Sequence, residues 1–107
     1  MRLNAGELTR RVAIQHQTSA RDALGDVVET WTDRHNPVAA ARRDVRGQEY
    51  FAAGAEHARA DKRWLVRWRA GIAPGMRIVE NGQAHDIVHV VEHGREALEI
   101  MTRAVLD

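Results

Sequence analysis

Hydrophobic and polar residues alternate along much of this chain, most clearly in the segment from Lys62 to Arg69. Trp64, Val66 and Trp68 have the same parity within this segment. Successive side chains of a β-strand point to opposite faces of a sheet, so both indoles would lie on one face, whereas a helix would scatter them. The alternation therefore predicts a strand over residues 62–69 with its aromatic face directed inward.

Similar patterns predict strands over residues 10–18, 27–33, 76–80, 84–91 and 97–104. Residues 38–45 are ambiguous because alanine favours a helix, but Pro37 and Gly47 bound a strand-length segment, and we assign a strand there. Residues 19–26 have the composition of a turn around Gly25, and their number is too large to fix the register of a first hairpin. Asn36-Pro37 is predicted to break the chain, because proline restricts the residue before it. Asn81-Gly82 is typical of a tight hairpin turn.

Residues 47–60 have helical periodicity, since Phe51, Ala55 and Ala58 form one apolar stripe. We therefore expect a mainly β fold: a small antiparallel β-barrel or sandwich of about six or seven strands with one short α-helix at about residues 47–60. The expected core residues are Val12, Ile14, Trp31, Phe51, Trp64, Val66, Trp68, Ile78, Ile87, Leu98 and Ile100.

The length of 107 residues suits a single domain, with residues 1–9 as a flexible N-terminal arm. Cysteine is absent, which excludes disulfides and thiolate metal sites. No apolar stretch reaches the roughly 18 residues of a membrane span. The N-terminus lacks the apolar core of a signal peptide. These features are typical of a soluble intracellular protein.

Residues suited to catalysis or metal binding do not form a recognisable site. His85, His89 and His93 are spaced four apart, which would build a metal-binding face on a helix. On the strand predicted there, four residues span about 13 Å, too far for one metal ion. Ser19, the only serine, has no glycine elbow around it, and no glycine motif for phosphate is present. We expect no enzyme activity, no cofactor and no metal.

Arginine supplies nearly all the basic residues, but the formal net charge is only +1. Two local basic clusters are assigned to an interface or channel wall: Arg42, Arg43 and Arg46, and Arg59, Lys62, Arg63, Arg67 and Arg69. One interpretation is an OB-like barrel on which Trp64 and Trp68 stack single-stranded nucleic acid. The other places the indoles in the core, and we favour it because exposed paired indoles are costly in water.

Four segments, in order, resemble a known family: GELTRRVAIQ (6–15), DALGDVVETW (22–31), RGQEYFAAGA (46–55) and KRWLVRWRAGIAPGMRIVENGQAHDI (62–87). They are similar to the phage head–tail joining family, also called head-closure or stopper proteins. Val38 and His85 depart from it, since that family often has tryptophan and another aromatic residue there. We expect a looser local core at both positions.

The resemblance implies a small β-barrel with one helix and no catalytic residues. Copies would form a ring with a portal adaptor protein on one side and a tail protein on the other, as a structural virion protein of a phage, prophage or phage-like particle. The protein would be made in the bacterial host cytoplasm. A loop would close the channel, with non-specific contact to packaged DNA and no membrane contact. A tail-side completion protein is a weaker possibility. We expect the connections 19–26 and 44–61 to provide subunit contacts or channel wall.

Overall fold

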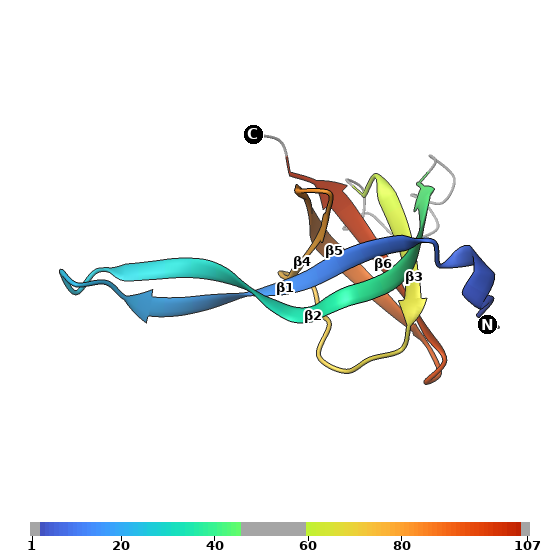
Figure 1. The fold of residues 1–107 in the computed structure, drawn as a ribbon, viewed down its shortest axis with the longest axis horizontal. Coiled ribbons are helices and arrows are strands. Elements are labelled where there is room, and N and C mark those ends of the chain that lie inside the picture. The colour runs from blue at the N-terminus through green and yellow to red at the C-terminus, as the bar shows by residue number, and fades with distance from the viewer. Residues whose placement is uncertain (1–2, 46–59, 106–107) are drawn as a thin grey trace.

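The computed structural model describes residues 3–45 and 60–105, which form one closed antiparallel β-barrel (Figure 1). Its strands are β1 (Arg10–Arg21), β2 (Val27–Asp44), β3 (Lys62–Arg67), β4 (Arg77–Glu80), β5 (Gln83–His93) and β6 (Ala97–Ala104). They are hydrogen-bonded in the order β1-β2-β3-β6-β5-β4, which closes on itself. The mainly β antiparallel barrel predicted from the alternation is confirmed.

Helical structure in the described residues is limited to the single 3-10 helix η1 (Ala5–Glu7), capped by the side chain of Asn4. Leu8 follows it and is buried, so the described part of the predicted N-terminal arm contacts the barrel. Of the helix predicted at about residues 47–60, all but Ala60 lies outside the described residues, and Ala60 itself is not helical.

The barrel core is built from alternate residues of all six strands. Trp64 is completely buried at its centre, and its neighbours of the same parity on β3 and β6 are Val66, Leu98 and Ile100. The remaining buried members are Val12, Ile14, Val38, Ala40, Met76, Ile78 and Ile87. Trp68 lies just beyond the end of β3 and packs against this cluster while staying partly exposed. Period-two alternation thus accounts for most of the core.

The first hairpin is longer and more regular than its sequence suggested. The strands continue to Arg21 and restart at Val27, so the connection has five residues rather than the eight from Ser19 to Asp26. β-Branched residues favour this extension, and the Thr18 hydroxyl lies 3.1 Å from that of Thr30 across the ladder. The distal part of β1 and β2 therefore projects from the barrel as a two-stranded ribbon (Figure 1).

The break predicted at Asn36-Pro37 is wrong, because β2 runs through it without interruption. Between the pairs Val12–Val38 and Ile14–His35 the register shifts, which leaves Asn36 and Pro37 opposite Ala13 alone. Pairing of β2 with β3 begins only at Ala40. Proline is tolerated in a strand at such a bulge on an unpaired edge, since no ladder bond needs its missing N–H.

Other turns agree with the sequence. Asn81 and Gly82 connect β4 and β5 with φ angles of 50° and 79°, the left-handed conformation that a tight hairpin turn of this dipeptide requires. β6 spans residues 97–104 as expected, and β3 ends at Arg67, two residues early.

Trp31, which the sequence places in the core, lies instead at the base of the projecting ribbon. Its ring is half-buried beneath the guanidinium of Arg77, whose central carbon lies 4.3 Å from the ring centroid. Arg77 is held in place because its Nε donates a hydrogen bond of 2.8 Å to Gln15 Oε1. The contact joins the ribbon to β4 and leaves the ribbon beyond it without support from the barrel.

Candidate interaction surfaces

Residues that could support chemistry or metal binding are scattered in the described part of the chain. No group of three or more His, Asp or Glu residues there could hold a metal ion, and His85, His89 and His93 lie along β5 as a strand rather than a helix. No described helix is long and apolar enough to cross a membrane.

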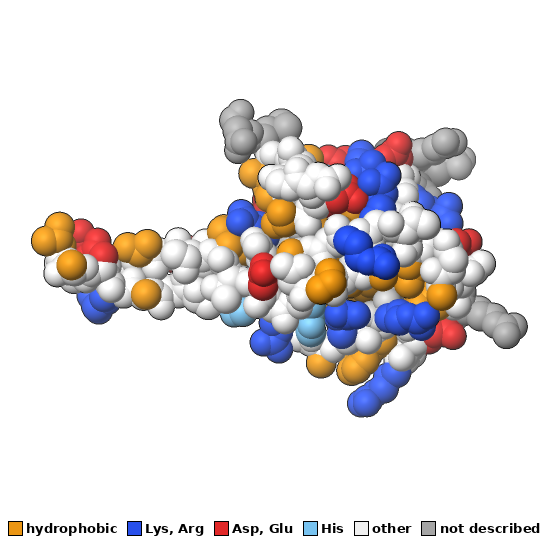
Figure 2. All heavy atoms as spheres, in the orientation of Figure 1, with side chains coloured by type: hydrophobic (Ala, Val, Ile, Leu, Met, Phe, Trp, Pro, Cys, Tyr) orange, Lys and Arg blue, Asp and Glu red, His pale blue; other side chains and the backbone are white. Residues whose placement is uncertain are grey.

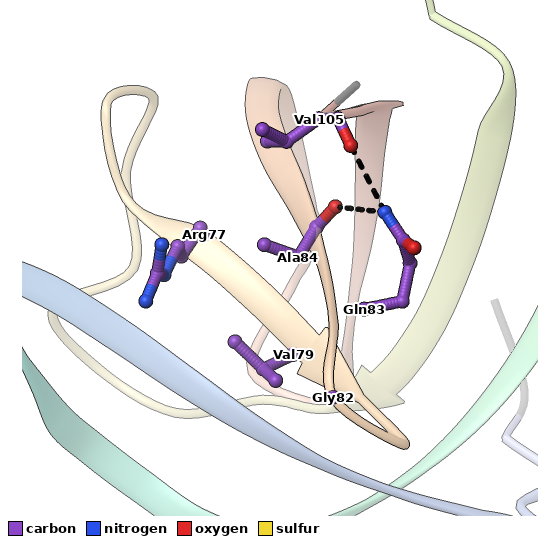
Figure 3. A pocket seen from close by; sticks show the side chains of 6 residues that line it. All are labelled: Arg77, Val79, Gly82, Gln83, Ala84 and Val105. Atoms are coloured by element: carbon purple, nitrogen blue, oxygen red, sulfur yellow. Dashed lines mark hydrogen bonds between the residues drawn. The ribbon is translucent and has the colours of Figure 1, made fainter. Parts of the chain in front are cut away.

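A pocket of about 230 Å³ lies beside the β4–β5 hairpin (Figure 3). Its lining residues are Arg77, Val79, Gly82, Gln83, Ala84 and Val105. The Gln83 amide donates to the carbonyls of Ala84 at 3.2 Å and Val105 at 3.0 Å, and Arg77 is engaged by Gln15 and Trp31. Because these polar groups already serve internal contacts, the pocket offers little to orient a ligand.

Of the first basic cluster, Arg42 is held by a buried carboxylate. Glu80 accepts hydrogen bonds of 2.9 Å from Arg42 Nη1 and from Arg10 Nη1, one on each oxygen. The ion pairs join the end of β4 to β1 and β2. Arg43 pairs at 3.6 Å with Glu7, and Arg46 lies outside the described residues. Arg42 and Arg43 are therefore ion-paired within the described residues, and Arg42 also stabilises the barrel.

The second basic cluster is divided by the fold. Lys62 pairs with Asp44 at 3.0 Å and Arg63 with Glu99 at 3.7 Å, so both serve the barrel wall. Arg59 lies outside the described residues. Arg67 and Arg69, at the other end of β3, form no ion pair with a carboxylate in the described part of the chain.

Arg67 and Arg69 share their end of the barrel with two arginines that the sequence did not single out. Arg95 in the β5–β6 turn lies over the ring of Trp68, 5.0 Å from its centroid. Arg34 of β2 lies directly against Gly71 in the β3–β4 connection. Neither forms an ion pair with a described carboxylate. We call this surface the basic end; it consists of Arg34, Arg67, Arg69, Arg95 and Trp68.

The basic end also contains N–H donors without acceptors. Trp68 Nε1 and Arg69 Nε are shielded from solvent and have no hydrogen-bond partner in the structure. Orphaned buried donors are uncommon in native proteins and call for an explanation. The β3–β4 connection and the β5–β6 turn that carry this surface lie together at the lower margin of the barrel (Figure 1), where basic side chains gather (Figure 2).

The projecting ribbon, residues 16–32, is the second candidate surface, and we call it the hairpin arm. Beyond Gln15, β1 pairs with β2 but no longer with β4, and β2 pairs with β3 only from Ala40 onward. Both edges of the arm are therefore free of neighbouring strands. A two-stranded hairpin alone is marginally stable in water, and unpaired edges are ready to bind other chains.

The distal end of the arm, residues 21–29, carries the largest exposed apolar side chains in the described part of the molecule. Leu24 is 87% exposed, Val27 60% and Val28 40%. Figure 2 shows hydrophobic side chains beside acidic ones at this end. We call residues 21–29 the tip. Its charged residues are Asp22, Asp26 and Glu29 against the single Arg21, so its net charge is negative.

The turn within the tip is well ordered by internal hydrogen bonds. Asp22 Oδ1 accepts from the backbone N–H groups of Leu24 and Asp26, both at 2.9 Å. Arg21 Nη1 donates to the carbonyl of Gly25 at 2.8 Å, and Gly25 takes the positive φ of 85° that this turn needs. These hydrogen bonds restrain the turn that carries the exposed Leu24, and such restraint lowers the entropy cost of binding.

The two tryptophans of residues 62–69 do not form a stacking platform. Trp64 is 0% exposed, and its indole Nε1 donates to Thr102 Oγ1 inside the barrel. Trp68 is covered on one face by Arg95. Bases stack only on accessible rings, so the interpretation as a single-strand binder using both indoles is wrong.

Both positions at which the sequence departs from the resembling family are buried. Val38 belongs to the core cluster. The His85 ring contacts Trp64 edge to face, with centroids 5.2 Å apart, and thereby occupies an aromatic position. Burial lowers the pKa of His85 below its ordinary value, although the carboxylates of Asp61 and Glu80 partly offset this effect.

The sequence predicts a first hairpin and assigns residues 19–26 to subunit contacts, but it does not show that the hairpin projects from the barrel, and it misses Arg34 and Arg95 of the basic end. An apolar residue, Leu24, in the middle of a turn between Asp22 and Gly25 was the available signal, because buried turns are rare and such a side chain must be exposed. Arg34 and Arg95 are remote in sequence from Arg67 and Arg69, and only the barrel topology brings them together.

Three comparisons with known proteins find relatives of this chain. The family described as "Phage head completion protein" matches residues 3–105. The head completion protein gp7 of Enterobacteria phage HK97 is 36% identical over 76 residues, which cover 71% of this chain and 67% of that protein. The solution structure of protein SF1141 from Shigella flexneri 2a has 31% identity and a TM-score of 0.78, covering 95% of this chain and 96% of that one.

Proposed function

Since the chain belongs to the phage head completion protein family, it is a structural virion protein of the head–tail junction and not an enzyme, and we propose that its copies form a ring in the connector that joins head to tail. The neighbours of the ring are a portal adaptor protein on one side and a tail protein on the other. The ring encloses the DNA channel and helps to retain packaged DNA. The protein is made in the cytoplasm of the bacterial host.

The observation that carries this proposal is the hairpin arm. In a free monomer, the ribbon is exposed to water and its tip carries apolar side chains, which is unfavourable in free energy. A bound partner would stabilise it. The barrel, by contrast, is closed and satisfies its own strand edges, except along the arm. A rigid body with one projecting contact element suits repeated association in one direction, and such heterologous contacts generate a ring when the rotation closes.

The ion-paired basic residues support a mechanical role for the barrel. Glu80 joins three strands through Arg10 and Arg42, and Arg63 with Glu99 joins β3 to β6. These cross-strand pairs stiffen the wall that must transmit load between head and tail. No step in this function requires bond chemistry.

Shortening the hairpin arm tests the proposal. Removal of Ala20, Arg21, Val27 and Val28 takes away two facing pairs, keeps the parity of the strands and leaves residues 22–26 as the turn. The purified variant should melt close to the intact protein, because no core residue is lost. Supplied in place of the intact protein during phage production, it should yield heads that leak DNA or lack tails.

The matched control is Ser19→Ala, which changes an exposed arm residue without changing the arm's length. It should support normal particles. Normal yields of tailed, DNA-retaining particles from the shortened variant would contradict the proposal.

A further inference from the structure

We propose that the tip of the hairpin arm docks on the basic end of the next copy of this chain, with Leu24 packing beside Trp68 and the carboxylates of the tip facing Arg67 and Arg69. This inference rests on the proposed ring and names both surfaces of its subunit contact. Four features of the described residues support it: charge, apolar character, unsatisfied hydrogen-bond donors and reach.

Charge is complementary between the two surfaces. The tip carries Asp22, Asp26 and Glu29 against one arginine. The basic end carries four arginines, and the neighbouring carboxylates are Glu92 near the end of β5 and Glu96 in the β5–β6 turn. Most other described cations and carboxylates on the barrel wall pair with one another. Of the described surfaces, the basic end is therefore the one that should attract an acidic element most strongly.

Both surfaces also have an apolar centre surrounded by charge. Leu24, Val27 and Val28 form the centre of the tip. At the basic end, Trp68 and Ile72 pack against the core cluster while remaining partly exposed. Aromatic and arginine side chains are the residue types most enriched at the energetic centres of protein interfaces.

The unsatisfied donors of the basic end fit the same partner. Trp68 Nε1 and Arg69 Nε lack acceptors, and a carboxylate accepts up to about four hydrogen bonds. A small displacement of these side chains on docking would bring the donors to Asp26 or Glu29. The free subunit would then carry the free-energy penalty of two unsatisfied buried donors, and association would remove it.

The dimensions of the molecule allow the contact only between copies. The tip and the basic end lie far apart within one subunit (Figure 1). The six residues of β1 beyond Gln15 extend about 20 Å, and the molecule measures 49 × 29 × 25 Å in all. An arm of this length reaches across most of a neighbouring barrel. Each copy donates one tip and accepts another, so the contact is heterologous.

Double-stranded DNA is the competing occupant of the basic end. Its phosphates would also pair with these arginines. A polyanion offers no counterpart for the apolar centre, and the acidic tip would remain unexplained. The structure therefore favours a second copy, and DNA is one of the outcomes of the test.

Because the chain has no cysteine, cysteine pairs can be introduced at chosen positions without competing disulfides. Ala23→Cys at the tip combined with Ala70→Cys beside Trp68 should give a ladder of disulfide-linked multimers when the concentrated protein is oxidised. The control pairs Ala23→Cys with Gln83→Cys, another exposed position, on the β4–β5 hairpin. It should give several-fold fewer multimers.

A set of charge-reversal variants forms the second part of the experiment. Asp26→Lys with Glu29→Lys, or Arg67→Glu with Arg69→Glu, should each reduce the ladder several-fold, and combining all four should restore it. Circular dichroism confirms that each variant is folded. A ladder equal to that of the Gln83 control, or one unaffected by charge reversal, would overturn the proposal.

Filter binding of double-stranded DNA completes the test. Loss of DNA binding in the Arg67→Glu, Arg69→Glu variant with an unchanged ladder would assign the basic end to DNA instead. Because the ladder is formed by purified protein, it is read independently of the particle assay. Failure of this contact is thus distinguishable from failure of the head–tail role.

Discussion

The indole Nε1 of Trp64 donates a hydrogen bond of 2.8 Å to Thr102 Oγ1 across the β3–β6 ladder, and both side chains are completely buried. The bond places a polar pair at the centre of an otherwise apolar barrel. It fixes the orientation of the largest core side chain, against which the Arg42 guanidinium and the His85 ring also lie. The register between β3 and β6 is therefore held by a specific contact as well as by packing.

Replacing Thr102 by valine should lower the free energy of unfolding by about 1–3 kcal/mol, because it leaves the buried indole N–H without an acceptor. Denaturant titration gives the value. The same substitution in a Trp64→Phe background is the control, since no indole N–H remains there. Equal losses in both backgrounds would show that the hydrogen bond does not contribute.

Replacing Glu80 by glutamine should destabilise the protein, because Arg10 and Arg42 would face each other without a compensating charge. The loss should stay below the roughly 3–5 kcal/mol of a fully buried pair, since both arginines are partly exposed. Asp44→Asn, which breaks the more exposed pair with Lys62, should cost about 0–1 kcal/mol. The proposal of a stiffened wall fails if the two variants unfold alike.

Stability should decline as the pH falls below about 6.5, the pKa of histidine in an unfolded chain. Burial lowers the pKa of His85 in the folded protein, so the unfolded chain binds this proton first. The contribution of neutral His85 is complete above that pH and is lost as the pH falls through the lowered pKa. His85→Phe should show a flatter decline between pH 8 and pH 5 in denaturant titrations, and an unchanged slope would refute this assignment.

Leu24→Asp should leave the free energy of unfolding within about 0.5 kcal/mol of the intact protein, because the side chain is almost fully exposed. The same variant should lose association between copies and the assembly of tailed particles. Leu24→Met, which preserves an apolar tip, is the control and should assemble. Unimpaired assembly by Leu24→Asp would remove the tip from the account.

Local patterns in the sequence predicted the parts of this fold that depend on neighbouring residues. The parity of Trp64 and Val66 placed both in the core, and Asn81-Gly82 marked its turn. The resemblance to phage head–tail joining proteins is confirmed at the level of the head completion family. No single motif was specific for the family. The resemblance depended on the order and spacing of several short motifs.

Contacts between residues far apart in the sequence could not be predicted from it. Alternation is the same whether a strand closes a barrel or projects from it, so Trp31 was assigned to the core although it lies at the base of the arm. The sequence predicts a break at Pro37, because the bulge that accommodates this proline depends on the opposing strand. The sequence assigns Arg42 and Arg63 to an interface or channel wall and does not reveal their ion pairs, because their partners, Glu80 and Glu99, come from later strands.

Electron microscopy of the tailed particles that carry this chain tests its central role most directly. The account predicts a ring of these barrels at the head–tail junction, with the hairpin arm of each copy lying across the barrel of the next. Density in which the arms extend away from neighbouring copies, or a head–tail junction without a ring of these barrels, would contradict it.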